Sequence, residues 1–159
     1  MTAVTSKLNC IARIGLIVCL SAISDGRAES DGGLKLNENA VEFASQLIRH
    51  GHLIADGKGG WHEHKPSPAA ENDFIRLYGY TEYAKWHLGV DERYTVNTKR
   101  RYKFPYGDFT NVHRCGLLAV RGRAAEYKYH DIGDAAARLI GMTLSGRWGK
   151  GATATVKSR

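Results

Sequence analysis

DFTNVHRCGLLAVRGRAAEYKYHDIGDAAARLIGMTL, residues 108–144, is the stretch that decides the fold. Its apolar residues recur at helical spacing in two runs that a short polar link separates. Asp108 or Thr110 is expected to cap the first helix, which runs to Tyr127, and Asp131 is expected to cap the second. Because the link is short, the two helices are predicted to pack as an antiparallel pair.

A further amphipathic helix is predicted upstream of this pair. Asn37 can cap it, apolar residues follow at helical spacing, and Gly51 is placed to end it. Gly57, Gly59, Gly60 and Pro66 then fall between Gly51 and Pro68, and no regular element tolerates these residues together. This segment is predicted to be a loop that Trp61 anchors.

The middle of the chain predicts short elements. Ser67-Pro68 is a cap followed by a proline at the first helical position. Thr81 is expected to cap another short helix that runs through Leu88. A hairpin is predicted around Asn97-Thr98, and Pro105 is expected to end any strand there.

The predicted fold class is therefore mainly α. We expect a compact bundle of short helices with Gly- and aromatic-rich loops and a C-terminal antiparallel helix pair. A single helical domain is predicted over residues 34–144, followed by a flexible basic tail at 145–159 that is rich in Gly, Ser and Thr.

Composition and charge agree with one soluble globular domain. The 159 residues are 43% hydrophobic and 25% charged, which excludes a disordered chain. The net charge of +7 is uneven: residues 29–92 carry 6 Lys and Arg against 11 Asp and Glu, whereas residues 93–159 carry 14 against 4. Either the two halves neutralise each other, or the basic half faces an anionic partner.

The N-terminal extension has two interpretations. Lys7 and Arg13 precede an apolar run at 14–23, and the small-residue triplet Gly26-Arg27-Ala28 follows, which is the order of a secretory signal spanning residues 1–28. The run is shorter than the roughly 20 residues that span a bilayer, so no stable membrane anchor is expected. Alternatively the start is misplaced and translation begins near Leu34. The first interpretation places the protein in the periplasm or outside the cell, and the second in the cytoplasm.

Histidine pairs suggest an alternative metal site. His50 with His52 and His62 with His64 form two His-x-His pairs, and imidazole is a common ligand of zinc and copper. Their spacing matches no structural zinc signature, so the main interpretation is solvated loop histidines and no cofactor.

Cys115 is predicted to be a small core residue. Cys10 and Cys19 lie in the extension, so no disulfide framework exists within the domain. His113 is two residues from Cys115 and would point about 200° away from it on a helix. A distant partner, His64 or His87, is left open, and Asp108 is interpreted as a helix cap, so no catalytic residue is predicted.

Basic residues interleave with aromatic ones between Tyr94 and Tyr106, a pattern typical of surfaces that bind anions. Seven-residue spacing extends this set along the predicted helix as a ridge. The alternative is that the rings are core and the cations pair with the acidic half. The candidate anion-binding residues are Lys99, Arg100, Arg101, Lys103, Arg114, Arg121 and Lys128.

RYKFPYGDF at residues 101–109, followed by VHRCG at 112–116, resembles a group of small bacterial proteins of unknown function. The similarity runs from about Leu36 to Leu144. Members of the group begin near Leu36, which favours the misplaced start. The resemblance implies no activity, cofactor or catalytic residue.

The function predicted from sequence is binding rather than catalysis. The expected partner is an anionic macromolecule, either nucleic acid or acidic protein, that meets the basic C-terminal face. The alternative is a hydrolase or metal-dependent activity centred on the loop with His62 and His64.

Overall fold

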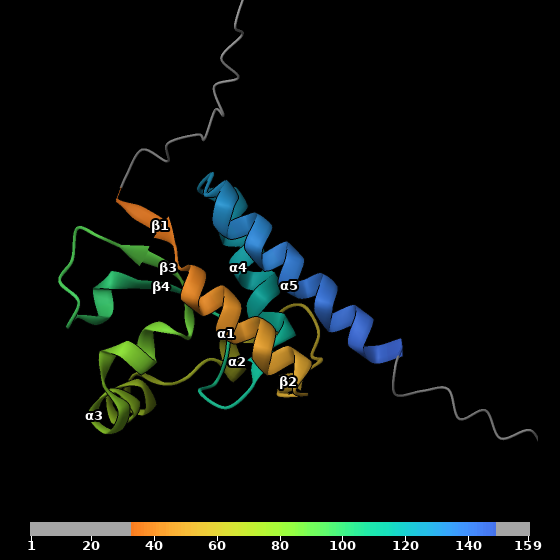
Figure 1. Ribbon diagram of the computed structural model, residues 1–159, viewed down its shortest axis with the longest axis horizontal. Helices are drawn as coiled ribbons and strands as arrows, with labels where there is room; N and C mark the ends of the chain where they lie inside the picture. The colour runs from red at the N-terminus through yellow and green to blue at the C-terminus, as the bar shows by residue number, and fades with distance from the viewer. Residues whose placement is uncertain (1–32, 149–159) are drawn as a thin grey trace, which may run out of the picture.

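The computed structural model describes residues 33–148, and helices make up most of them (Figure 1). The mainly α prediction is correct in part, because five short strands accompany the helices. In chain order the elements are β1 (Leu34–Leu36), α1 (Glu38–Arg49), β2 (Leu53–Ile54), α2 (Trp61–His64), α3 (Pro68–Ala84), β3 (His87–Asp91), η1 (Lys99–Arg101), β4 (Tyr102–Pro105), β5 (Val112–His113), α4 (Arg114–Glu126) and α5 (His130–Trp148).

The predicted C-terminal helix pair is confirmed. Helices α4 and α5 lie side by side, and the three residues Tyr127–Tyr129 connect them (Figure 1). Lys128 in this link adopts a left-handed backbone with φ of 61°, which turns the chain sharply between the helices. Buried side chains of both helices form the centre of the core: Leu117, Val120, Ala124, Ile132, Ala136 and Leu139.

The predicted bounds of this pair are wrong at both ends. Helix α4 begins only at Arg114. The Asp108 carboxylate caps a separate turn, accepting hydrogen bonds from the backbone amides of Thr110 and Asn111, and Val112–His113 then pair with β2 as strand β5. Helix α5 continues to Trp148, beyond Leu144, where the tail was expected to start. The rest of that tail lies outside the described residues, as does the N-terminal extension.

Local capping signals confirm two other helices. The Asn37 side chain accepts a hydrogen bond from the Ala40 amide and starts α1, and Gly51 follows its end with φ of 85°. Ser67 accepts from the Ala70 amide at the start of α3, where Pro68 occupies the first turn. Within α3, Gly79 breaks the helical backbone with φ of 80°.

The predicted helix from Thr81 through Leu88 is correct only in its first half: residues 81–84 are helical after the break at Gly79, but the helix does not continue to Leu88. Helix α3 ends at Ala84, and His87 opens strand β3 instead. Strand β3 is the middle strand of the sheet β1-β3-β4, and its hydrogen bonds to two neighbours outweigh local helix propensity.

Both sheets have a defined register. In the antiparallel sheet, β1 pairs Leu36 with Gly89, and β4 pairs Lys103 with the same glycine. Strands β3 and β4 form the predicted hairpin, whose β4 ends at Pro105. The second sheet is a parallel pair in which β2 places Ile54 beside His113 of β5. A parallel pair needs a long crossover, here the whole segment between the two strands.

Tyr106 connects the sheet region with the helices. Its ring is fully buried beside Trp86, and its hydroxyl donates to the Lys85 carbonyl at 2.6 Å, with the Ala40 carbonyl at 3.2 Å. A buried hydroxyl needs such a partner, and burial strongly raises the pKa of Tyr106.

None of the helices in residues 33–148 combines the length and apolarity needed to cross a bilayer.

We expect buried His87 to make stability pH-dependent. Burial lowers the pKa of His87 from 6.5 to about 4, while its Nδ1–H donates to the Tyr83 carbonyl at 2.9 Å. The unfolded chain therefore binds a proton first, and stability present above pH 6.5 is lost as pH falls toward 4, by up to about 3 kcal/mol. Chemical denaturation across this range measures the loss.

A matched pair of variants isolates this contribution. His87→Asn keeps a donor for the Tyr83 carbonyl and should flatten the dependence between pH 6.5 and 4, whereas exposed His50→Asn should leave it unchanged. Identical pH profiles for His87→Asn and the parent would contradict the assignment.

Candidate functional site

The parallel pairing of β2 and β5 brings two distant segments together. Ile54 of β2 lies beside His113 of β5. Two residues after each of them, Asp56 and Cys115 also lie next to each other. The Cys115 amide confirms the placement, since it donates to Asp56 Oδ1 at 2.6 Å. Cys115 stands in the first turn of α4, where backbone amides lack intrahelical acceptors.

The second oxygen of Asp56 is the centre of a cluster of four side chains. Its Oδ2 lies 2.7 Å from His113 Nδ1, 2.8 Å from His64 Nδ1 and 3.1 Å from Cys115 Sγ. Cys115 Sγ is also 3.5 Å from His64 Nδ1. We call Asp56, His64, His113 and Cys115 the Asp–His–His–Cys cluster.

Opposing effects set the charge of Asp56. Burial favours the neutral acid and would raise its pKa, but hydrogen bonds from His113 and from the Cys115 amide outweigh burial and lower the pKa to about 2. Asp56 is therefore a carboxylate at neutral pH, as a metal ligand must be.

A second carboxylate supports His113 from behind. Asp108 Oδ2 lies 3.1 Å from His113 Nε2, on the opposite side of the ring from Asp56. Asp108 is itself fixed by the Thr110 and Asn111 amides. Burial would raise its pKa, but these bonds and the one from His113 lower it overall. Such a carboxylate behind a histidine is typical of metal-binding histidines.

Trp61 and His64 close the outer side of the cluster. Trp61 opens α2, and its ring lies against Gly116, where a Cβ would come within 3.0 Å of the indole. His113 lies under the same indole, with ring centroids 6.1 Å apart. The His113 side chain is 8% exposed and that of His64 37%, so His64 forms the solvent-facing edge.

The four ligand atoms converge as a metal site requires. One ligand atom from each residue lies within 4.8 Å of all the others. In a tetrahedral zinc site with bonds of about 2.0–2.3 Å, ligand atoms are about 3.3–3.7 Å apart. The four contacts between 2.7 and 3.5 Å in the cluster are close to this spacing, and the remaining pairs of ligand atoms lie within 4.8 Å.

The structure places one of the four residues of the alternative metal set predicted from the His-x-His pairs in a cluster of possible ligands. His64 joins the cluster, but His50, His52 and His62 belong to no group of metal-ligand side chains in the described part of the chain. His50 and His52 follow the end of α1, whereas His62 lines a separate cavity.

The prediction that Cys115 is buried is confirmed, whereas the prediction about its neighbour His113 is wrong. Cys115 is buried, as expected. The expectation that His113 points away from it is wrong, because His113 is extended backbone before the helix and not part of it. Of the two distant partners left open, His64 reaches the sulfur, whereas His87 is buried against Tyr83.

The candidate anion-binding residues have several different surroundings. Lys99 forms an ion pair with Glu71 at 2.6 Å, which joins the basic and acidic halves of the chain.

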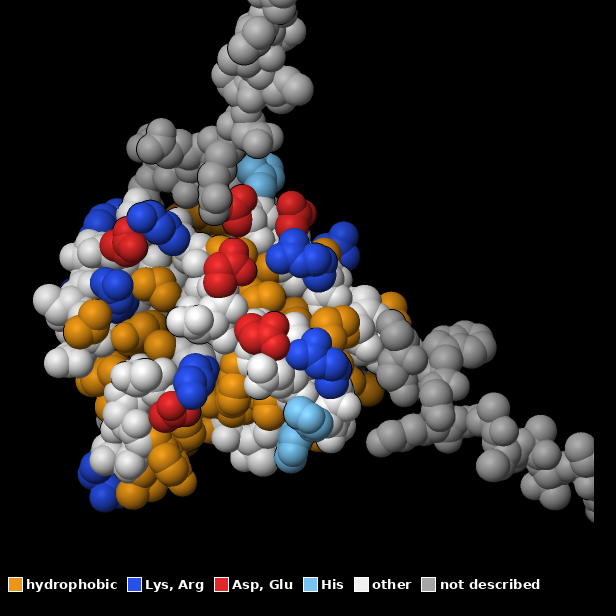
Figure 2. Space-filling view, viewed as in Figure 1, with side chains coloured by type: hydrophobic (Ala, Val, Ile, Leu, Met, Phe, Trp, Pro, Cys, Tyr) orange, Lys and Arg blue, Asp and Glu red, His pale blue; other side chains and the backbone are white. Residues whose placement is uncertain are grey.

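The predicted helical ridge of Arg114, Arg121 and Lys128 is wrong at one position, because Lys128 follows the end of α4. Lys and Arg side chains mix with acidic ones on the face in Figure 2. Arg101 donates to the Tyr94 carbonyl and Arg114 to the Asp56 carbonyl, while Arg100, Arg121 and Lys128 are exposed. Binding of an anionic macromolecule stays a prediction.

Cys115 should react slowly with alkylating reagents in the metal-free folded protein. Burial and the hydrogen bond to the Asp56 carboxylate raise the pKa of its thiol to about 12. We expect iodoacetamide to modify it at least about 100-fold more slowly than in urea, because the thiolate is the nucleophile. Peptide mass mapping separates Cys115 from Cys10 and Cys19.

Asp56→Asn serves as the comparison, since it removes the negative charge beside the sulfur and should accelerate modification. Equal rates for Cys115 in the folded and unfolded protein would contradict the burial assignment.

Comparison of the chain with protein-family models, with curated proteins and with solved structures finds no match. The resemblance to small bacterial proteins stays an expectation, and the geometry of the Asp–His–His–Cys cluster carries the functional argument.

Proposed function

We propose that this chain is a zinc-binding protein whose ligands are Asp56, His64, His113 and Cys115. The observation that carries the proposal is the convergence of four ligand atoms, all within 4.8 Å of one another, from three separate segments of the chain. Each residue type is an established zinc ligand.

The chemistry of the ligands favours zinc over the hard cations. Magnesium and calcium are bound by oxygen atoms, and this cluster offers one carboxylate against two imidazoles and a thiol. Thiolate and imidazole together suit zinc among the common divalent metals. Zinc would also displace the Cys115 thiol proton, because a coordinating thiol is deprotonated.

The same contacts argue against a cysteine nucleophile. In a nucleophile–base–carboxylate arrangement, the histidine contacts the nucleophile with one ring nitrogen and the carboxylate with the other. Here a single atom, His64 Nδ1, contacts both Asp56 and Cys115. The carboxylate also accepts directly from the thiol, which keeps the sulfur protonated.

The contacts of His113 also support metal binding. Both ring nitrogens lie within hydrogen-bond distance of carboxylates, and both contacts are hydrogen bonds only when both nitrogens carry protons. A metal ion at Nδ1 replaces one of these protons, while Nε2–H continues to donate to Asp108. The second contact then orients the ring toward the metal.

Four protein ligands favour a structural role for the metal. A catalytic zinc keeps one position for water, whereas a structural site is closed by four side chains. The metal would hold the loop after β2 and the short helix α2 against the start of α4. The hydrolase alternative is therefore less favoured by the ligand count than a stabilising metal.

The purified protein should bind one equivalent of zinc per chain. Cys115→Ser and His113→Ala should each lower the affinity at least about 100-fold, since changes outside the ligand set already cost 10–100-fold. Cobalt substitution supplies a second readout, because the thiolate-to-cobalt charge-transfer band should be absent in Cys115→Ser.

Histidines near the cluster provide the control for zinc binding. His62 lies two residues from His64 on the same helix but outside the cluster. The zinc content of His62→Ala should therefore match that of the unsubstituted protein. Zinc content that is lost equally in His62→Ala, or that is kept in Cys115→Ser and His113→Ala, would overturn the proposal.

Asp108 should act as a positioning residue for His113. Asp108→Asn keeps the side-chain shape and an oxygen for the Thr110 and Asn111 amides but removes the charge behind the imidazole. We expect zinc affinity to fall about 10–100-fold with one equivalent still bound at saturation. Competition with a chromogenic chelator measures the change, and unchanged affinity would exclude this role.

A further inference from the structure

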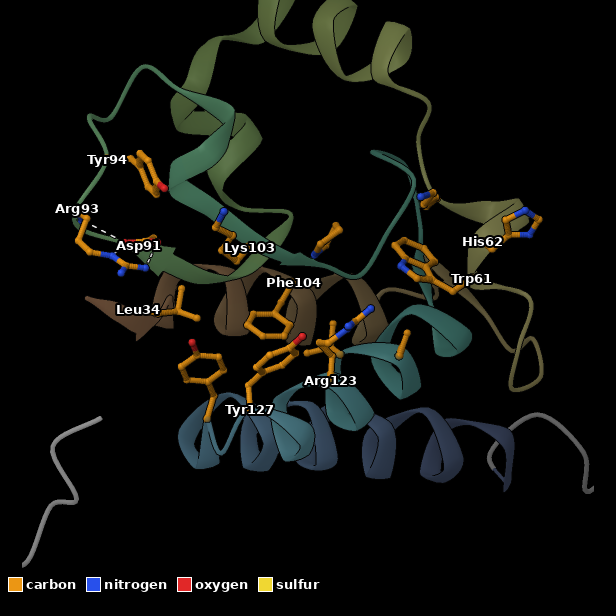
Figure 3. Close-up of a pocket in the computed structure, with 15 residues that line it drawn as sticks. Leu34, Trp61, His62, Asp91, Arg93, Tyr94, Lys103, Phe104, Arg123 and Tyr127 are labelled. Atoms are coloured by element: carbon orange, nitrogen blue, oxygen red, sulfur yellow. Dashed lines mark hydrogen bonds and ion pairs between the residues drawn. The ribbon is translucent and has the colours of Figure 1, made fainter. Parts of the chain in front are cut away.

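A second concave site lies beside Trp61, between β4 and the C-terminal half of α4 (Figure 3). Its volume is about 740 Å³, within the range of small-molecule sites. Figure 3 shows Phe104 in its middle, Trp61 at one end, and Arg93 and Tyr94 at the other. We call this space the Phe104 cavity.

The backbone of β4 is arranged to line this cavity. Lys103, Phe104 and Pro105 all contribute to its wall, although successive residues of a regular strand point to opposite faces. Phe104 breaks the alternation with φ of 62°, an unusual conformation for a bulky residue. Gly89 of β3 makes the ring's position possible, since a Cβ there would lie 2.9 Å from Phe104.

Aromatic rings supply flat apolar walls. Phe104 meets Tyr129 edge to face at 5.9 Å, and Tyr129 stacks with Tyr127 at 6.4 Å. Tyr127 lines the cavity and is 54% exposed, so part of its surface is accessible to a molecule there. Such walls bind planar rings by stacking.

Cations outnumber carboxylates around the same space. Lys65, Arg93, Lys103 and Arg123 line the cavity, whereas Asp91 is the one carboxylate among its described lining residues. Arg93 already neutralises that carboxylate through two hydrogen bonds of 2.9 Å. A net positive lining favours an anionic ligand.

Two of these cations border aromatic faces. Lys103 Nζ lies 5.5 Å from the Tyr94 ring, and the Arg123 guanidinium lies 5.8 Å from the Tyr127 ring. The ion pair of Arg123 with Glu126 is 3.6 Å long and exposed on both sides, so a ligand competes with it easily. At both places the cavity therefore presents an aromatic ring next to a positive charge.

We propose that the Phe104 cavity binds a small planar aromatic molecule that carries an anionic group. The ligand ring stacks between Phe104 and Tyr127, and its anionic group contacts Arg123 and Lys103. None of the four proposed zinc ligands lines the cavity, so this inference does not depend on the proposed metal.

Two matched dyes test the proposal with the full chain. The probe 8-anilino-1-naphthalenesulfonate has both the rings and an anion, whereas N-phenyl-1-naphthylamine has the rings alone. We expect the sulfonate to bind once per chain, and Arg123→Gln and Lys103→Gln each to weaken it about tenfold, the loss of one charge-assisted contact. Binding of the neutral dye should stay unchanged in both variants.

Arg121→Gln is the control, because Arg121 lies on the same helix but does not line the cavity. Circular dichroism verifies the fold of each variant. Competition by 1-naphthoate or by adenosine monophosphate supports the proposal and identifies a carboxylate or a phosphate as the preferred group. Competition by neither compound, or sulfonate binding that Arg121→Gln weakens as much as Arg123→Gln, overturns it.

Discussion

The hydrogen bond from the Cys115 amide to the Asp56 carboxylate is the contact on which the region around the site depends. Helix α4 has no side-chain cap from the residue before it, His113, so its first turn needs an acceptor from elsewhere. Asp56 supplies one from 59 positions away. Its negative charge also suits the positive end of the helix dipole. One carboxylate thus starts a helix and gathers the side chains of the cluster.

Much of the helical framework could be predicted from sequence, because its signals are local. Asn37 and Ser67 begin helices through their own side chains, and the apolar spacing of α4 and α5 defines a pair. Strand β3 could not be predicted in the same way. Its residues take up strand geometry because β1 and β4 flank them, and β1 is remote in sequence.

The site was harder to predict than the fold. The sequence predicts His64 as an alternative metal ligand and leaves it open as a partner of Cys115, but it does not predict Asp56, His113 or Cys115 as ligands. The strands that align them contain only two residues each, too short to produce a periodic pattern. The sequence predicts Asp108 as a helix cap, but α4 begins only at Arg114, and the Asp108 carboxylate contacts the His113 ring instead. A His-x-Cys pair at a strand-to-helix junction is the signal that was available.

The separation of Asp56 and Cys115 along the chain has a consequence for the unfolded protein. A metal ion that joined them would act as a cross-link, and the ring it would close contains α2, α3, β3, η1, β4 and β5. If the metal stays bound in the unfolded chain, a ring of this length lowers the conformational entropy of that chain. By the chain-entropy model for cross-links, this loss stabilises the folded state by about 4 kcal/mol. Helices α1 and α5 lie outside the ring, so the cross-link does not restrain them; packing holds both, and α1 also has hydrogen bonds from the Asn37 side chain to the Ala84 and His87 carbonyls. The metal would then divide the chain into a topologically closed middle and two open arms.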